Sequence, residues 1–459
     1  MLDVETQSGY IPLVHSSKAT VGGAIAGVLG AALSMTAAGG GYGIAWSLRD
    51  GAVILAVLLA FLSVHRYAVK SEDALRRAGI LIAVALFAAS AANSILSLFP
   101  NQEYGDSQRV VQVVGSGTPF SRWMTGTAAL NWLYAGLWKF PPLSALLPPS
   151  VNSAHGFVCL TGSLCMGAAA IASLLVCRAP LAVYITLTST MWMVFSFGYV
   201  EYYPFIAGLM IFFVAWLFGG AWGRNTPRRL GLFLGLIASF YVGFWPLAAI
   251  TGAVFTLAAP RKNWSAVAWA ALAYLCCVRF FWPQSPADFF LSLWHDMNFG
   301  EQFIHPRYAG LSAGPASLFF KTSYVFSLAH FRELAYQCFF SGTLMPLLLL
   351  GAATVVAARK AARGSLKGWM TPAKLAAMLL LAYYLRYFLW KIPRLGPRRD
   401  IDLYFEFYLL TPFCLGLALE ERTLGVSPSP GQRYVLLSFL TGSALPLCEI
   451  MIHKGLPAI

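Results

Sequence analysis

Acidic side chains are scarce in this 459-residue sequence, which contains only 18 Asp and Glu. Asp106, in the stretch NQEYGDSQRVV, follows a long apolar run, with Tyr104 two residues before it. A carboxylate at a membrane boundary is partly desolvated, and desolvation raises its basicity, so Asp106 is a candidate general base. An Asp followed by Ser is also typical of a helix N-cap, here for a helix starting at Ser107, and that structural role stays open.

Glu201 is the second acidic candidate, in FSFGYVEYYPFIAG at the junction of two apolar runs. An ionisable residue inside a membrane is costly and is therefore a functional candidate by default. If the two runs are separate spans, Glu201 lies at their turn, and Pro204 opens the next helix as a first-turn proline. A solvated turn residue beside an aromatic belt of Tyr202 and Tyr203 is the alternative interpretation.

A basic cluster precedes the next two acidic residues. The segment KIPRLGPRRDIDLYFEF, residues 391–407, contains Lys391, Arg394, Arg398 and Arg399. Arginine makes paired, charge-assisted hydrogen bonds with phosphate, so this segment is predicted to bind an anion at the membrane surface. Asp400 and Asp402 could pair with the arginines, or could contact a substrate hydroxyl or a metal. Binding of lipid headgroups without any reaction is the alternative.

Histidines gather in a later polar segment. The stretches SLWHDMNFGEQFIHPRY, from residue 292, and LAHFRELAYQ, from residue 328, contain His295, Asp296, His305, His330 and Glu333. His330 and Glu333 are three residues apart and would share a helix face, but one such pair is weak evidence for a metal site. The sequence has no HExxH motif and no cluster of His and Cys. A divalent metal cofactor is left open, and no metal ligand is assigned.

A membrane-embedded chain must position these residues. Hydrophobic residues make up 58% of the sequence and charged residues 11%, with a mean hydropathy of +0.66. Soluble proteins average about 25% charged residues, which excludes a soluble enzyme, and the apolar content excludes a disordered chain. Runs long enough to cross a bilayer predict an all-α polytopic membrane protein with about 11–13 transmembrane helices. The runs lie near residues 20–46, 51–66, 78–98, 155–177, 181–200, 203–222, 230–246, 247–260, 264–282, 341–358, 375–391, 401–419 and 434–452.

The distribution of basic residues predicts the orientation. With the N-terminus placed in the cytoplasm, the cytoplasmic connections hold 18 of the 32 Lys and Arg, and the much longer exterior loops hold 13. This positive-inside bias also accounts for the net charge of +14, so no nucleic-acid partner is expected. The polar, acidic start of the chain is unlike a cleavable signal peptide, so the first apolar segment is expected to be retained. The eight cysteines form no CxxC pair, and no disulfide framework is expected.

Two long segments, 99–154 and 283–340, fall on the exterior side. Both mix polar and apolar residues, as in HFRELAYQCFF, which favours helices lying in the membrane interface. Ten of the 18 acidic residues also map to the exterior side, which favours an outward-facing site. No internal repeat is visible, which removes the commonest sequence sign of a secondary transporter.

The order of these motifs resembles the GT-C superfamily of membrane-embedded glycosyltransferases, and in particular its bacterial GT-C-like proteins. The resemblance rests on YGDSQRV with Asp106 in the first long loop, GYVEYYP with Glu201, LAHFRE, and GPRRDIDLYFEF near the end. It covers most of residues 78–420, so residues 1–77 would be a cytoplasmic tail with two additional spans, and 78–459 the GT-C-like transmembrane domain. The chain departs from the family pattern in two ways. Its first long loop follows the third predicted span instead of the first, and this loop carries a single Asp instead of an acidic pair.

The resemblance implies an inverting hexosyl or pentosyl transfer from a polyprenyl-phosphate-linked sugar to a glycan, lipid or protein acceptor. It places the protein in the bacterial inner membrane, with the active site facing the periplasm. Asp106 would be the general base and Arg398 and Arg399 would stabilise the leaving phosphate, with Lys391 and Arg394 beside them. Glu201 is counted with Asp106 as catalytic. The substrate pocket is predicted to include Tyr104, Tyr202, Tyr203, His295, His330, Glu333, Asp400 and Asp402. A flippase or transporter for lipid-linked sugars or phospholipids, and a non-catalytic scaffold, are the alternatives.

Overall fold

A computed structural model gives the fold of most of the chain. It describes residues 17–96, 107–116, 127–139, 153–197, 199–219, 226–258, 264–282, 285–299, 306–308, 310–311, 319–362, 371–393, 401–420 and 428–456. Helices dominate these ranges, and no strand occurs in them, although isolated bridges do, such as the one that pairs Phe319 with Lys391. The predicted all-α fold is therefore confirmed for the described part of the chain.

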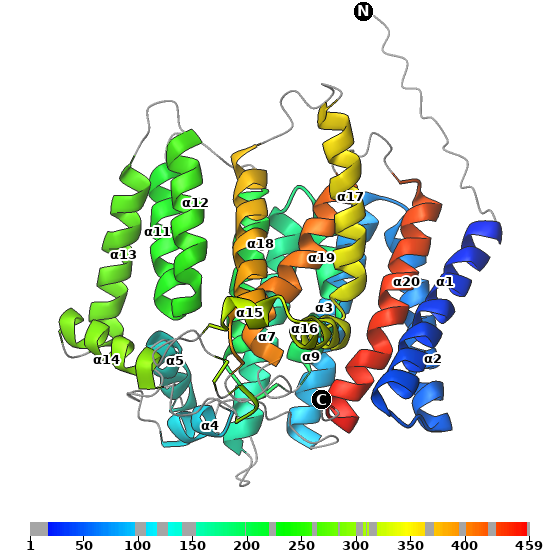
Figure 1. Ribbon diagram of the computed structural model, residues 1–459, viewed down its shortest axis with the longest axis horizontal. Helices are drawn as coiled ribbons and strands as arrows, with labels where there is room; N and C mark the ends of the chain where they lie inside the picture. Colours follow the sequence, from blue (N-terminus) through cyan, green and yellow to red (C-terminus); the bar gives the residue numbers. More distant parts are fainter. Residues whose placement is uncertain are drawn as a thin grey trace, which may run out of the picture.

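The helices follow one another along the chain as in Figure 1. The first half forms α1 (Ser17–Thr36), η1 (Ala37–Gly41), α2 (Leu48–Ala68), α3 (Glu72–Leu96), α4 (Ser107–Ser116), α5 (Ala128–Trp138), α7 (Ser153–Val176), α8 (Pro180–Leu187), α9 (Thr190–Ser196) and α10 (Tyr203–Leu217). The second half forms α11 (Thr226–Phe240), η3 (Val242–Phe244), α12 (Trp245–Ala258), α13 (Ser265–Phe281), α14 (Pro286–Phe299), η5 (Pro306–Tyr308), α15 (Thr322–Val325), α16 (Leu328–Phe340), α17 (Leu344–Ala362), α18 (Pro372–Trp390), η6 (Ile401–Tyr404), α19 (Phe405–Glu420), α20 (Pro430–Glu449) and η7 (Ile450–Lys454).

Several of these helices are long and apolar enough to cross a membrane. Among the described residues there are six, and α16 with α17 would make a seventh if that pair, bent by 103°, is one broken span. The six are Lys18–Gly41, Leu48–Ala68, Glu72–Ser94, Ala154–Val176, Ile401–Glu420 and Pro430–Lys454. Shorter apolar helices follow at Tyr203–Leu217, Val242–Ala258 and Ser265–Phe281. The protein is thus an integral membrane protein.

Every apolar run predicted from the sequence contains a helix, but not every run is one long helix. The run 181–200 is divided into α8 and α9, where the α8 C-cap Thr188 and the next residue, Ser189, bond backbone carbonyls of the preceding turn. Such side-chain bonds compete with continuation of a helix. Runs 230–246 and 247–260 form α11 and α12, which pack together as a hairpin through the short η3 turn. The break in 181–200 and the shortness of helices such as α10 and α13 leave fewer described helices of spanning length than the 11–13 expected.

Local sequence signals set the helix starts. Ser47 and Asp50 form a capping box at α2, and Ser429 and Gln432 form another at α20, so each pair satisfies backbone N–H groups that lack helical partners. Prolines stand in the first turn of α8, α10, α18 and α20, where a missing N–H costs nothing. The helix predicted to open at Pro204 is α10, and the one predicted to start at Ser107 is α4.

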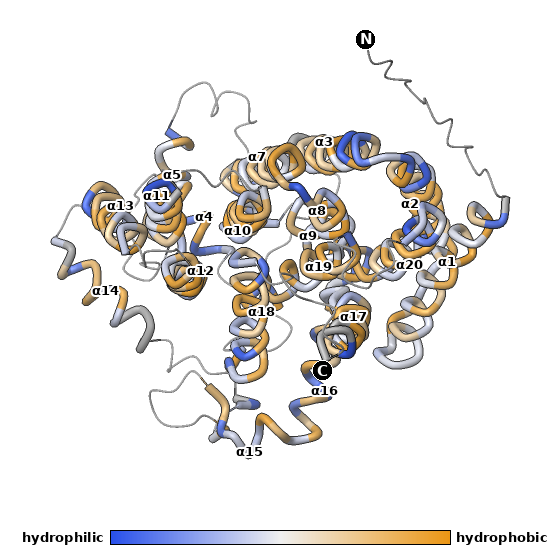
Figure 2. The backbone as a smooth tube through the Cα atoms, turned by 90° about the horizontal axis from the view of Figure 1, so that it is seen from above, coloured by the Kyte–Doolittle hydropathy of each residue, from blue (hydrophilic) through white to orange (hydrophobic). Residues whose placement is uncertain are grey.

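The described helices pack around a central pair, as seen from above in Figure 2. There α8 and α19 lie in the middle, with α3, α7, α10, α18 and α20 around them, and α11–α13 form a group to one side. In the α19 segment Ile401–Glu420, 89% of the apolar window is buried, against 28% for Leu48–Ala68 at the edge. Because α1 and α2 expose apolar side chains on their outer faces, we expect these faces to contact lipid.

The two N-terminal spans pack against the C-terminal helix. Ser34 Oγ in α1 donates to the carbonyl of Ser443 in α20 at 2.9 Å, and Gly442 of α20 faces the backbone of Gly27 with no room for a side chain. His65 of α2 lies between Tyr184 Oη, at 2.8 Å, and Thr441 Oγ1, at 2.9 Å. The predicted additional spans are therefore built into the bundle.

The two ends of the bundle differ in character (Figure 1). One end, the lower end in the figure, holds α4, α5, α14, the segment between α9 and α10, and the C-terminus. The other, the upper end, holds the α2–α3 and α7–α8 connections and the start of α20. The basic connections predicted to be cytoplasmic belong to the upper end, and α4, α5 and α14 of the two long loops lie at the lower end.

Candidate functional site

Buried carboxylates and tyrosines meet inside the lower half of the bundle. We call the group of Tyr199, Glu201, Tyr241, Asp402 and Glu406 the tyrosine–carboxylate cluster. Tyr199 and Glu201 come from the segment between α9 and α10, Tyr241 from the α11–α12 turn, and the other two from η6 and the first turn of α19. The three carboxylate residues are only 2% to 4% exposed. Burying three acids together is costly unless each finds partners.

Tyr199 joins two of these acids. Its hydroxyl donates a short hydrogen bond to Asp402 Oδ2, and the charge of Glu201 also acts on it. Burial, followed by the charges of Asp402 and Glu201, raises the pKa of Tyr199 well above its ordinary value. The phenol therefore stays protonated and remains a hydrogen-bond donor at all physiological pH values.

Glu201 is held from the first long loop. Ser107 Oγ, in the first turn of α4, donates to Glu201 Oε1 at 3.3 Å. The residue that follows Asp106 in the chain therefore contacts Glu201. Two motifs that lie almost 100 residues apart in the sequence thus share one contact.

Glu406 has the least compensated position. Its Oε2 atom is buried and makes no hydrogen bond to any described residue. The hydroxyls of Tyr241 and Tyr384 lie within electrostatic range of its carboxylate, and Tyr384 donates to the carbonyl of Gly243 at 3.1 Å. Glu406 is not among the site residues predicted from the sequence. Its spacing was a usable signal, because a residue four positions after Asp402 falls on the same helix face.

Aromatic rings form one wall beside the cluster. The Tyr203 ring lies 5.3 Å from Phe405 and 6.4 Å from Tyr241, and it stacks on Phe195 at 6.3 Å between centroids. Tyr203 is half-buried here, whereas Tyr202 is 3% exposed and packs edge-on against Tyr134 at 4.9 Å. Tyr202 is therefore a core residue and not an interfacial anchor, because α5 covers it.

Two cations stand at the end of α18 near the cluster. Lys391 is 9% exposed, and its Nζ lies 5.5 Å from the Tyr387 ring centroid and 5.8 Å from that of Phe319. Arg386 also stands over Phe319, at 5.9 Å. The Tyr387 hydroxyl is within range of Tyr241, which links the cations to the cluster. Arg386 was not predicted as a cation of the site because it falls inside the predicted span 375–391.

His330 and Glu333 of α16 have separate structural partners. His330 Nε2 bonds the carbonyl of Leu389 at 2.7 Å, which ties α16 to α18. Glu333 is buried and accepts from Tyr324 at 3.2 Å and Tyr308 at 3.4 Å, and Arg307 lies 2.8 Å from its other oxygen. Burial, and then the Glu333 charge, raises the pKa of Tyr324 to about 12, so this phenol stays a donor. The two residues thus do not share a ligand site, although both hold the second long loop in place.

Several predicted site residues lie outside the described residues. These are Tyr104, Asp106, Arg394, Arg398, Arg399 and Asp400. His295 belongs to α14, but its side chain is also outside the described part. Within the described residues no group of three or more His, Cys, Asp or Glu side chains is arranged to hold a metal ion.

Comparisons with other proteins leave the site to be interpreted on its own geometry. No family model, no curated protein and no solved structure matches this chain. The site is therefore defined by its chemistry: three buried acids, one of them bonded by the Tyr199 hydroxyl, further tyrosines within electrostatic range, and two cations at the end of a neighbouring helix.

Proposed function

We propose that this protein is a membrane glycosyltransferase that moves a sugar from a polyprenyl-phosphate donor to an acceptor hydroxyl. The observation that carries the proposal is the hydrogen bond from Tyr199 to Asp402 with Glu201 within electrostatic range of the same hydroxyl, at the end of the bundle where α4, α5 and α14 lie. Buried acids beside neutral donors suit a ligand rich in hydroxyl groups, because each acid can accept hydrogen bonds from it. The motif resemblance to GT-C enzymes supports the same reaction class.

The chemistry requires a base and a stabilised leaving group. A carboxylate removes the proton from the acceptor hydroxyl, whose oxygen attacks the anomeric carbon of the sugar. The bond between that carbon and the phosphate oxygen breaks, and its electron pair leaves with the polyprenyl phosphate. Attack from the face opposite to the phosphate inverts the anomeric centre. Positioned cations lower the barrier because negative charge develops on the phosphate.

The acids are assigned by their surroundings. Asp106 is proposed as the base, and its chain neighbour Ser107 supports this by contacting Glu201. Asp402 already accepts a hydrogen bond from Tyr199. It is therefore better suited to accept a hydrogen bond from a sugar hydroxyl than to act as the base that removes a proton. Glu201 would position the acceptor between the two. A divalent metal stays open in this scheme.

The phosphate is assigned to the basic end of α18. Lys391 and Arg386 share the face of Phe319, and Arg394, Arg398 and Arg399 follow Lys391 within eight residues. Lysine acts as a point charge and arginine as a fork with paired donors, so together they suit a lipid-linked phosphate at the membrane surface. The isoprenoid tail would lie against the apolar helices beside it.

The side of the membrane follows from charge. The upper-end connections carry the denser positive charge, which favours a cytoplasmic location for that end. The cluster would then open to the exterior, which is the periplasm if the protein resides in a bacterial inner membrane. Donor lipids and acceptors on that side would reach the cluster past α4, α5 and α14, which lie at that end of the bundle.

A flippase or transporter for lipid-linked sugars or phospholipids is the second candidate, because it also needs a phosphate site. Such a protein needs polar groups along a path through the bilayer. The buried acids described above gather towards one end, which favours a reaction there over transport. A non-catalytic scaffold predicts the same fold without turnover, and the experiments below separate the three.

The proposal is tested by donor binding and by turnover. Purified protein is incubated with a panel of mass-tagged polyprenyl-phosphate sugars, and retention is compared between wild type, Lys391→Gln and Arg398→Ala/Arg399→Ala. Lys139→Gln is the matched control, since Lys139 is an exposed cation at the C-cap of α5. We expect one donor to be retained by wild type and the control, and lost from the other two variants.

Turnover then separates enzyme from transporter and scaffold. Asp106→Asn should abolish sugar transfer while leaving expression and donor retention intact, because it removes only the base. Retention without transfer in the wild type, across all acceptors tried, would leave transport or scaffolding as the better explanation. No retention of any donor would overturn the donor assignment.

A further inference from the structure

A cavity at the upper end of the bundle lies far from the tyrosine–carboxylate cluster. Its volume is about 220 Å³, and it lies where α2, α3, α8, α19 and α20 meet. Its lining residues are Ala68, Val69, Ser71, Glu72, Leu75, Leu181, Glu420, Arg433 and Leu437. Charges of both signs therefore face one small space, and the proposed reaction uses none of them.

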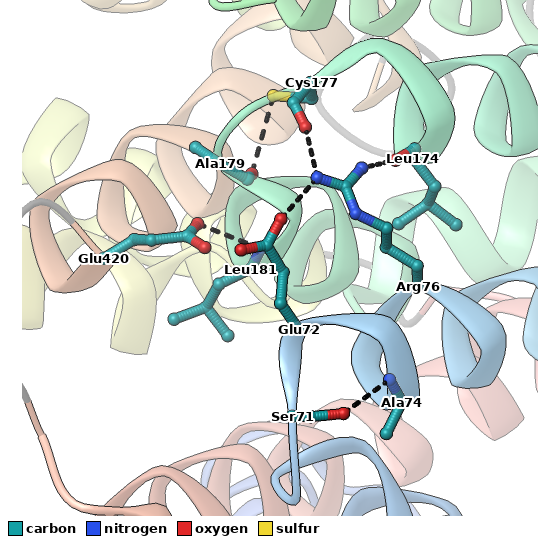
Figure 3. A network of polar contacts seen from close by, with 9 residues as sticks. All are labelled: Ser71, Glu72, Ala74, Arg76, Leu174, Cys177, Ala179, Leu181 and Glu420. Atoms are coloured by element: carbon teal, nitrogen blue, oxygen red, sulfur yellow. Dashed lines mark hydrogen bonds and ion pairs between the residues drawn. The ribbon is translucent and has the colours of Figure 1, made fainter. Parts of the chain in front are cut away.

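Arg76 holds Glu72, one of the lining residues, in place (Figure 3). It donates to the carbonyls of Leu174 and Cys177, which are free at the C-terminal end of α7, and to Glu72 Oε1 at 2.6 Å. The guanidinium is thus used by the protein itself. Glu72 is held by one oxygen only, so its second oxygen is left without a donor among the described residues.

Glu420 is held in the same way from the opposite wall. Its Oε2 accepts from the backbone N–H of Leu181, at the start of α8, at 3.0 Å. Its other oxygen has no hydrogen-bond donor among the described residues. Glu72 and Glu420 lie within electrostatic range of each other, and Arg433 is within range of Glu420. The Glu72 side chain is 59% exposed and Glu420 is half-buried, so both carboxylates are accessible from the cavity, with Arg433 beside Glu420. Accessible charges of both signs suit a ligand that carries both a cation and an anion.

The cavity lies at the boundary of the membrane. Four of the candidate spans end or begin around it: Leu48–Ala68, Glu72–Ser94, Ile401–Glu420 and Pro430–Lys454. Span ends mark the level of lipid headgroups, so a ligand here is presented at headgroup depth. A headgroup that combines a primary ammonium with a phosphate matches both charges of the cavity.

We propose that this cavity binds a phosphoethanolamine group, with its ammonium between Glu72 and Glu420 and its phosphate beside Arg433. An ammonium has three donors and no acceptor, so it can satisfy the two carboxylate oxygens together. A choline headgroup has no N–H to donate, and a glycerol headgroup has no cation. The site is therefore selective for the primary amine, whether a membrane lipid or a free phosphoethanolamine carries it.

The experiment measures lipid retention by the full-length protein. Protein is reconstituted in nanodiscs that contain phosphatidylethanolamine and phosphatidylglycerol in equal amounts, then extracted in detergent, and retained lipid is counted by native mass spectrometry. The test variants are Glu72→Gln and Glu420→Gln. The control is Asp73→Asn, an exposed acid next to Glu72 that does not line the cavity.

We expect about one phosphatidylethanolamine per wild-type chain, with about tenfold weaker retention in either Gln variant, as loss of a charge-assisted hydrogen bond would give. Asp73→Asn and the melting temperature of all variants should be unchanged. A parallel arm adds free phosphoethanolamine to delipidated protein, and Glu420-dependent binding of the free compound alone would assign the same site to a soluble ligand. Equal retention of both lipids, or equal loss in the Asp73 control, would overturn the proposal.

Discussion

The phenol of Tyr199 donates a hydrogen bond to Asp402, a residue 203 positions further along the chain. The contact joins the segment between α9 and α10 to the 3-10 turn that opens α19. It fixes Asp402 next to Glu201, which is itself bonded by Ser107 from the first long loop. Three regions of the sequence are therefore placed at one site by two hydrogen bonds.

Removing the Tyr199 hydroxyl tests this relationship. Tyr199→Phe leaves a buried Asp402 without its neutral donor, and such a loss costs about 1.5–3 kcal/mol. If the bond positions Asp402 for sugar transfer, kcat/KM should fall roughly tenfold or more. Tyr202→Phe is the control, because the Tyr202 hydroxyl is buried with no partner among the described residues. An equal loss in both variants would point to general disturbance of the core.

Two buried glutamates should respond in opposite ways to the same substitution. Glu406 has one carboxylate oxygen with no partner among the described residues, whereas Glu333 is held by Arg307 and two tyrosines. Glu406→Gln removes an acid that gains little from its surroundings, so the free energy of unfolding should be unchanged or rise by about 1 kcal/mol. Glu333→Gln should lower it by about 1–3 kcal/mol. Thermal denaturation in detergent compares them, and a marked loss in Glu406→Gln would contradict this view.

The sequence predicted the helices better than their interruptions. Hydropathy located the long apolar helices because lipid demands continuous apolar length, so runs such as 51–66 and 155–177 coincide with α2 and α7. The division of 181–200 into two helices depends on Thr188 and Ser189 bonding backbone carbonyls, and hydropathy does not register such bonds. The runs 230–246 and 247–260 meet in the hairpin of α11 and α12, and the η3 turn between them begins at Val242, inside the first predicted run.

The site was predictable as a set of residue types but not as an assembly. Glu201 and Asp402 were identified because acids are rare in this chain, and both belong to one cluster. His330 and Glu333 share a helix face as expected, yet separate partners hold them, because those partners come from α18, η5 and α15. Tyr241 was not identified because it falls inside the predicted run 230–246, and the sequence does not show that this run ends in a turn beside Glu406.

The orientation of the bundle can be tested by labelling from each side. Ser71, in the α2–α3 connection, and Ser285, before α14, are both exposed and lie at opposite ends. In a background without native cysteines, Ser285→Cys should react with an impermeant maleimide in intact cells. Ser71→Cys should react only after the membrane is opened. The reverse pattern would place the tyrosine–carboxylate cluster on the cytoplasmic side and remove the proposed periplasmic reaction.

Close packing of α1 on α20 should make one glycine intolerant of substitution. A Cβ atom on Gly442 would collide with the carbonyl group of Gly27, whereas nothing lies within 4 Å of the corresponding position on Gly51 in α2. Overpacking of this kind typically costs about 1–3 kcal/mol, because backbone cannot yield as a flexible side chain can. Gly442→Ala should therefore lower the melting temperature. Gly51→Ala should leave it unchanged or raise it, since Ala is the better helix former by about 1 kcal/mol. If Gly442→Ala were as stable as the wild type, α1 would not be held against α20, and the N-terminal spans would be a separable addition.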